Sequence, residues 1–214
     1  MAEPLAIDNH LSGRLRAGIN IYRGLCPRPA PDLPATIAER LPSIRLAHGA
    51  ALPPGFAMSR RLYKSFGIDP TKHRPSSEAL WRRLRDHGDF PAVNPVVDLT
   101  NLLSLQFQVC FGLYDLERLQ PPLAITLGAA GDRYQGIRKQ VLDFAGKIVL
   151  RDGQGPFGNP SADSLRASVD QDSRDILQVL FFSADDPEPQ RVLSSALAAF
   201  SEFFTMAGNR SYFI

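Results

Sequence analysis

Hydrophobic and polar residues alternate with two different periods along this chain, which predicts a mixture of strands and helices. Residues 14–25 place Leu15, Ala17, Ile19 and Ile21 at every second position, the pattern of a β-strand with one buried face. Four further segments are short, apolar or β-branched, and lie in a glycine-rich part of the chain. They are residues 123–127, 136–142, 147–151 and 176–182. The second half of the chain is therefore expected to be mostly sheet or barrel.

Helices are predicted where apolar residues recur at spacings of three or four. Ser76 or Ser77 is expected to cap one of them, and Asn94 followed by Pro95 to open the next. Asp186 is expected to cap the last helix. The predicted helices cover residues 32–41, 59–66, 76–87, 95–108 and 187–207.

Length and composition favour one compact domain over residues 1–214, since 44% of the 214 residues are hydrophobic. No apolar run approaches the roughly 20 residues of a membrane span, and the first residues lack the pattern of a signal peptide. A cytoplasmic location is expected. Cys26 and Cys110 are predicted to be small core residues. The four histidines share no metal-binding interval, so neither metal nor cofactor is expected.

Positive charge is concentrated in one segment, although the whole chain carries only +2. Eight of the 24 Lys and Arg residues fall between Arg60 and Arg85, opposed there by Asp69 and Glu78. Two interpretations remain open, an RNA-binding face or two merely solvated helices. The interleaved Tyr63, His73 and Trp81 could stack on bases. The candidate RNA-binding residues are Arg60, Arg61, Lys64, Lys72, Arg74, Arg82, Arg83 and Arg85.

Polar residues lie on one side of the otherwise apolar segment 94–108. Helical spacing gathers Asp98, Asn101, Ser104 and Gln108 into about a third of the circumference. They could line a pocket, or they could be core polar residues that hydrogen-bond internally. The sequence leaves these alternatives open.

Two familiar motifs, one for dinucleotide binding and one for a catalytic serine, are incomplete or absent. Gly153, Gly155 and Gly158 match G-x-G-x-x-G, but Pro156 and Pro160 interrupt the helix that a dinucleotide site needs. A bent glycine loop between strands is predicted instead. There is no G-x-S-x-G motif, so water is the plausible nucleophile for any reaction.

Four segments, in order, carry a family resemblance over about residues 60–183: RLYKSFGIDPTKHRPSSEALWRRL, VNPVVDLTNLLSL, YDLERL and VLRDGQGPFGNPSADSLR. They resemble the tRNA-editing domain of the phenylalanyl-tRNA synthetase beta subunit, which consists of its fused third and fourth domains. The resemblance implies an α+β fold, a β-rich sheet or barrel core covered by helices. The strand and helix within 1–58 and the helix 187–207 are expected to pack on this core. A synthetase domain would not fit, so a free-standing module is expected.

In the family, the pocket lies beneath a helix written V-V-D-x-T-N, which corresponds to residues 96–101. Gly112 stands where the family has a pocket histidine, and a family glutamate has no clear match beyond Gln178. Losing both groups removes the obvious proton handlers, which favours binding over catalysis and leaves no catalytic residue assigned. The pocket residues that the resemblance implies are Asp98, Thr100, Asn101, Gly112, Tyr114, Asp115, Gly158 and Asn159.

The resemblance implies a tRNA-binding or RNA-binding module that could hydrolyse mischarged aminoacyl-tRNA in trans. Its expected partner is tRNA or aminoacyl-tRNA, with no membrane partner and no DNA specificity. Two rivals stay open: a binder of amino acids or other small molecules that has lost tRNA, and an interaction module without a ligand.

Overall fold

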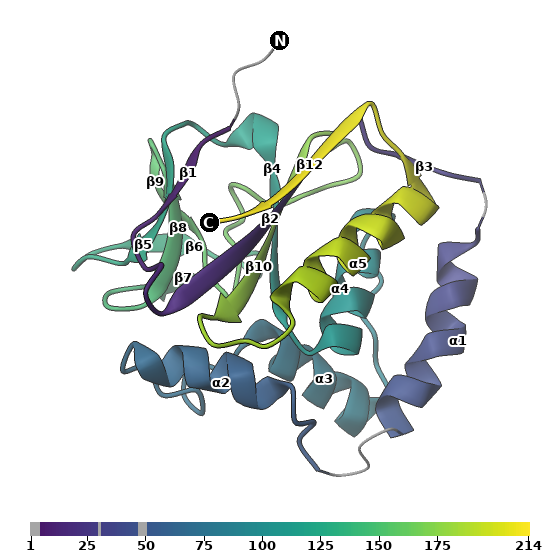
Figure 1. Cartoon of the computed structure of the whole chain (residues 1–214), viewed down its shortest axis with the longest axis horizontal. Coiled ribbons are helices and arrows are strands. Elements are labelled where there is room, and N and C mark those ends of the chain that lie inside the picture. The colour runs from purple at the N-terminus through teal and green to yellow at the C-terminus, as the bar shows by residue number, and fades with distance from the viewer. Residues whose placement is uncertain (1–4, 30, 47–50) are drawn as a thin grey trace.

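The computed structural model describes residues 5–29, 31–46 and 51–214, and its centre is a four-stranded antiparallel sheet (Figure 1). The strand order is β12-β2-β10-β4. Its strands are β2 (Leu15–Arg23), β4 (Cys110–Asp115), β10 (Ile176–Ser183) and β12 (Gly208–Phe213).

A second four-stranded sheet packs against the central one, in the order β1-β5-β8-β9. β1 runs parallel to β5, and the other neighbours are antiparallel. Two strand pairs are smaller, β6 with β7 and β3 with β11. The bounds are β1 (Ile7–Asn9), β3 (Cys26–Pro27), β5 (Leu123–Leu127), β6 (Arg133–Gln135), β7 (Val141–Asp143), β8 (Ile148–Asp152), β9 (Gly155–Gly158) and β11 (Phe204–Thr205).

Helices cover the remaining surface of the central sheet. α4 (Pro95–Phe107) and α5 (Pro189–Phe203) pack on its other face, and α1 (Leu33–Leu46) packs on α4. α2 (Phe56–Ser65) and α3 (Ser76–His87) lie along one end, at the bottom of Figure 1. A short 3-10 helix, η1 (Leu116–Arg118), follows β4. The α+β class expected from the family resemblance is confirmed.

β10 shows why a strand can appear in the sequence as a continuous apolar run. All of its residues are buried, because one face packs on the second sheet and the other on the helices. Leu177 and Val179 join the core between the sheets, while Leu180 and Phe182 join the core beneath α4 and α5. The period of two is preserved on a strand that is covered on both sides.

Several predicted elements are confirmed, including the strand at 14–25, the strands at 123–127, 147–151 and 176–182, and the cap at Asn94, whose side chain accepts from Val97 N. The strand at 136–142 is wrong. That segment is largely the turn of the β6–β7 hairpin, where Lys139 has a positive φ of 64°. The last helix ends at Phe203 instead of continuing to 207, and β11 and β12 follow it.

Three local expectations are also wrong. The N-caps of α3 and α5 are Pro75 and Glu188, neither of which makes a side-chain capping bond. Cys26 is exposed on β3, a strand of two residues that is too short to enclose it, whereas Cys110 is buried.

Within the described residues, no helix is long and apolar enough to cross a membrane. Among the same residues, no group of three or more His, Cys, Asp or Glu side chains could hold a metal ion.

Candidate functional site

A cavity of about 160 Å³ lies between α3, α4 and the loop of residues 159–164, which we call the 159–164 loop. Most of its lining is polar. Its walls are Ser76, Leu80, Thr100, Asn101, Ser104, Phe111, Asn159, Ser161, Ala162 and Asp163. A cavity of this size holds several water molecules or one ring-sized side chain.

α4 contributes two of the predicted pocket residues, Thr100 and Asn101, whose side chains differ in their hydrogen bonding. The hydroxyl of Thr100 donates to Val96 O (3.0 Å) and accepts from Gln178 Nε2 (3.3 Å), so its hydrogen bonding is largely satisfied inside the protein. Asn101 is half-buried, and its amide has no hydrogen-bond partner among the residues that the structure describes. The Asn101 side chain is therefore available to a ligand.

Gln178 lies beside this helix but does not line the cavity. Its side chain is fully buried, and its carbonyl oxygen accepts from Asn20 Nδ2 and Tyr22 Oη, each at 3.0 Å. Gln178 therefore fixes Thr100 from beneath and does not contact a ligand.

Five of the eight predicted pocket residues do not line the cavity: Asp98, Gly112, Tyr114, Asp115 and Gly158. Two of these, Asp98 and Asp115, are bound elsewhere. The carboxylate of Asp98 accepts from Val93 N (2.8 Å) before the start of α4. The buried carboxylate of Asp115 accepts from Ser173 Oγ (2.6 Å) and Glu117 N (3.0 Å) at the start of η1. Both carboxylates order loops.

The ring of Tyr114 fills the space between Gly112 and Gly158. A Cβ atom on either glycine would overlap the Tyr114 hydroxyl group, so this close approach requires glycine at both positions. A histidine at 112 could not coexist with this tyrosine position. The pocket that the resemblance places here is thus partly filled by Tyr114, and the open cavity lies beside the ring.

The 159–164 loop is held at successive residues. Asn159 donates to Ile148 O (2.5 Å) and accepts from Ser161 N (2.8 Å), so its side chain is used inside the protein. Pro160 O accepts from Ser76 N (3.0 Å) at the start of α3. The Ser161 hydroxyl bonds to Tyr63 Oη (2.5 Å). These contacts give the cavity a rigid wall.

Asp163 is the one ionisable side chain among the cavity residues. Its Oδ1 accepts from Tyr114 Oη at 2.6 Å. Burial raises the pKa of Asp163 from 3.8 to about 7, although the bond from Tyr114 and the amides of Leu113 and Asn159 act to lower it. A carboxyl group that titrates near neutrality in a cavity is typical of a functional site.

A second concavity, which we call the basic groove, has a volume of about 510 Å³ and adjoins α3. It gathers four arginines, three of which were predicted to bind RNA. The fourth, Arg138, comes from the turn of the β6–β7 hairpin. The groove is lined by Arg74, Ala79, Arg82, Arg83, Asp86, His87 and Arg138.

A buried carboxylate holds part of this groove together. Glu78 has no exposed side-chain surface and binds Arg60 through both oxygens, at 2.7 and 2.8 Å. It also binds Arg82 Nε at 2.9 Å and lies 3.8 Å from Arg74 Nε. Burial acts to raise the pKa of Glu78, but the bonds and charges of the arginines outweigh it, and the pKa lies below its ordinary value. One negative charge thus orders three positive ones.

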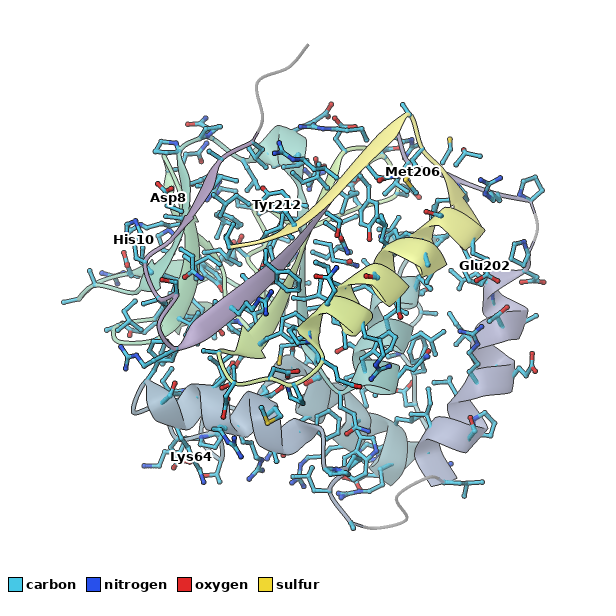
Figure 2. All side chains as sticks on the ribbon, viewed as in Figure 1. Asp8, His10, Lys64, Glu202, Met206 and Tyr212 are labelled. Atoms are coloured by element: carbon cyan, nitrogen blue, oxygen red, sulfur yellow. The ribbon has the colours of Figure 1, made fainter. Side chains whose placement is uncertain are left out.

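The other predicted RNA-binding residues do not line the groove. Arg60 is turned to Glu78, Arg61 pairs with Asp185, and Arg85 pairs with Asp86. Lys64 and Lys72 are exposed, and Figure 2 shows Lys64 on the outer side of α2.

Two of the expected stacking groups are buried and cannot contact bases. Tyr63 and Trp81 are buried, with 2% and 1% of their surface exposed. Trp81 packs against Phe56. His73 is exposed but does not line the basic groove.

The basic groove and the cavity have α3 as a common wall. Ala79 lines the groove, while Ser76 and Leu80 line the cavity. The β6–β7 hairpin links them as well, because Ile137 N donates to Asp163 O at 3.3 Å next to Arg138.

Comparison with known proteins supports the family resemblance. A profile of the B3/4 domain family matches residues 58–186. The structure is similar to the crystal structure of an N-terminal fragment of the phenylalanyl-tRNA synthetase beta subunit from Pyrococcus horikoshii, with a TM-score of 0.45 and 13% sequence identity. The match covers 56% of this chain and 43% of that one, so the chain spans less than half of that fragment. None of the curated proteins compared matches. The chain belongs to the B3/4 domain family and is a relative of the domain found in the phenylalanyl-tRNA synthetase beta subunit.

Proposed function

We propose that this chain binds tRNA, with phosphates in the basic groove and the aminoacylated 3′ end in the cavity. The observation that carries the proposal is the position of α3, whose first half forms part of both walls. A strand of RNA that lies along the groove would bring its end to the cavity without crossing the body of the protein.

The basic groove suits phosphate because its cations are arginines on fixed elements. Guanidinium groups bind phosphate oxygens through two parallel hydrogen bonds. Glu78 holds Arg82 and approaches Arg74, so less side-chain freedom is lost when a phosphate binds. Arg83 and Arg138 approach from separate elements, α3 and the hairpin. The groove therefore has a net positive charge despite Asp86.

The cavity suits a small group attached to the end of a chain. Its volume of about 160 Å³ is below the 300–1,000 Å³ of usual ligand pockets. It is similar to cavities that hold a benzene ring. Polar walls with a free amide at Asn101 suit an aminoacyl group better than a purely apolar ligand.

Salt-dependent binding of tRNA tests the proposal. The double variant Arg83→Gln/Arg138→Gln should bind more weakly, and the slope of log K against log salt should fall by about two. Arg191→Gln on α5 is the control, since Arg191 pairs with Glu188 as Arg83 pairs with Asp89, and Arg191 lies outside the groove. Equal affinity and slope for the double variant and the control would refute the proposal.

The rival function, binding of a free amino acid or other small molecule, is favoured by the small size of the cavity. Ligands that bind the native state raise the melting temperature. Stabilisation by free amino acids, without any effect of tRNA, would favour this rival.

A further inference from the structure

The cavity contains the elements of a hydrolytic site that lacks the family histidine. Asp163 provides a carboxyl group, Asn101 a free amide, and Ser76 a hydroxyl group at the start of α3. No ion pair engages Asp163 within the described part of the chain. A carboxylate accepts about four hydrogen bonds. Tyr114 Oη donates to Oδ1, and the amides of Leu113 and Asn159 favour the charged form, so the carboxylate keeps acceptor capacity for a water molecule in the cavity.

We propose that Asp163 is the catalytic base of an ester hydrolysis in this cavity and that water is the nucleophile. The inference deepens the proposed function and rests on it for the nature of the ester, an amino acid joined to the terminal ribose of a tRNA. The binding of water by Asp163 does not depend on the basic groove.

The reaction balances with groups that are present. Asp163 takes a proton from water as the water oxygen bonds to the ester carbonyl carbon. The amide of Asn101 donates to the oxyanion that forms, and the helix start at Ser76 adds positive potential there. The intermediate then collapses, the bond to the ribose oxygen breaks, and the protonated Asp163 returns its proton to that oxygen. The products are the free amino acid and a ribose hydroxyl.

The surroundings of Asp163 favour this role near neutral pH. The facing titratable groups are Tyr114 from β4 and Tyr134 from β6, and burial raises the pKa of both, so both phenols stay neutral. The neighbouring wall residues of α3 and α4 are uncharged. Asp163 is therefore protonated below about pH 7 and becomes a base above it.

The 159–164 loop holds this base in place. Ala162 O accepts from Tyr134 Oη, and Asp163 O accepts from Ile137 N. Contacts on both sides of Asp163 fix its backbone, which is the preorganisation that a catalytic group requires.

The test compares four proteins: the wild type, Asp163→Asn, Tyr114→Phe and Asp186→Asn. Asp186 is the matched control because it is another half-buried carboxyl group with a raised pKa, and it lies before α5, away from the cavity. The substrates are tRNAs charged with correct or incorrect amino acids, and 3′-aminoacyl adenosines that lack the phosphate chain. Ester half-lives are measured from pH 5 to 9, together with tRNA affinity.

The wild-type rate should rise tenfold per pH unit up to about pH 7 and then level off. Asp163→Asn should lose about 10²–10⁴-fold in rate while keeping its affinity for tRNA. Tyr114→Phe removes a hydrogen bond that lowers the pKa of Asp163, so its pH profile should move to higher pH. The Asp186→Asn profile should match the wild type.

Two results would overturn the inference. One is a wild type that leaves every ester intact, and the other is an Asp163→Asn variant as active as the wild type. Hydrolysis of 3′-aminoacyl adenosines that depends on Asp163, without any binding of tRNA, would uphold the inference and refute the proposed function instead.

Discussion

Replacing Asp163 by asparagine should stabilise the protein at alkaline pH. In the folded protein burial raises the pKa of Asp163 to about 7, against 3.8 for an ordinary aspartate. The folded state therefore holds its proton where the unfolded state has released it. The contribution of Asp163 to the free energy of unfolding is fully present below about pH 4 and is lost as the pH rises towards 7. Asparagine has no proton to lose and avoids this cost.

The size of the effect follows from the two pKa values. A gap from 3.8 to about 7, at about 1.4 kcal/mol per pH unit, gives at most about 4 kcal/mol. The free energy of unfolding of Asp163→Asn minus that of the wild type should therefore grow by up to that amount between pH 4 and pH 8. Any constant difference between the two side chains cancels in this comparison.

Urea denaturation at a series of pH values measures the difference directly. Asp186→Asn serves as the control for general effects of removing a half-buried carboxyl group, with a smaller dependence on pH expected. A difference between Asp163→Asn and the wild type that stays constant from pH 4 to pH 8 would refute the pKa assignment, and with it the pH dependence expected of the hydrolysis.

Three further predictions concern packing and exposure. Glu78→Ala should lower the free energy of unfolding, measured by urea denaturation, by roughly 2–4 kcal/mol, because Arg60 and Arg82 lose a buried partner. An unchanged urea midpoint would contradict this. Gly112→Ala should cost roughly 1–3 kcal/mol through overlap with Tyr114, and less in a Tyr114→Phe background; equal costs in both backgrounds would show that the hydroxyl group is not the obstacle. A thiol reagent should modify Cys26 in the native protein and reach Cys110 only after denaturation, so two fast native reactions would contradict the burial of Cys110.

The sequence predicted those elements whose local signals agree with their packing. The cap at Asn94 has a direct counterpart in α4, and the strand predicted at 14–25 is present as β2. The solvent-facing side expected from its alternation is wrong, because residues 17–22 are buried on both faces of the strand. β12 was missed because it is an edge strand with little apolar alternation, held by its backbone pairing with β2.

The candidate site was predicted only in part. Thr100, Asn101 and Asn159, which the resemblance assigns to a pocket, line the cavity, but the hydrogen bonds of Asn159 turn its side chain inward. Asp163 carries no local signal, since its burial arises from Tyr114 and from a hairpin more than twenty residues away. The family segment that ends in PSADSLR does contain Asp163, and that was the one available indication.

Arg138 was missed for a related reason. It lies outside the basic segment between Arg60 and Arg85, and only the folding of the β6–β7 hairpin brings it to the groove. Conversely, Glu78 was counted as an opposing charge, whereas in the structure it organises the arginines around it.

Because β10 pairs with β2, we expect that a fragment of this chain must include β2 in order to fold. Residues 58–186 match the family profile and contain β4 and β10, yet β2 and β12 lie outside them. A fragment cut to those limits would leave one side of β10 with open backbone hydrogen-bonding groups and apolar side chains in water. We expect such a fragment to aggregate, so laboratory work on either cavity or groove should begin with both flanking segments attached.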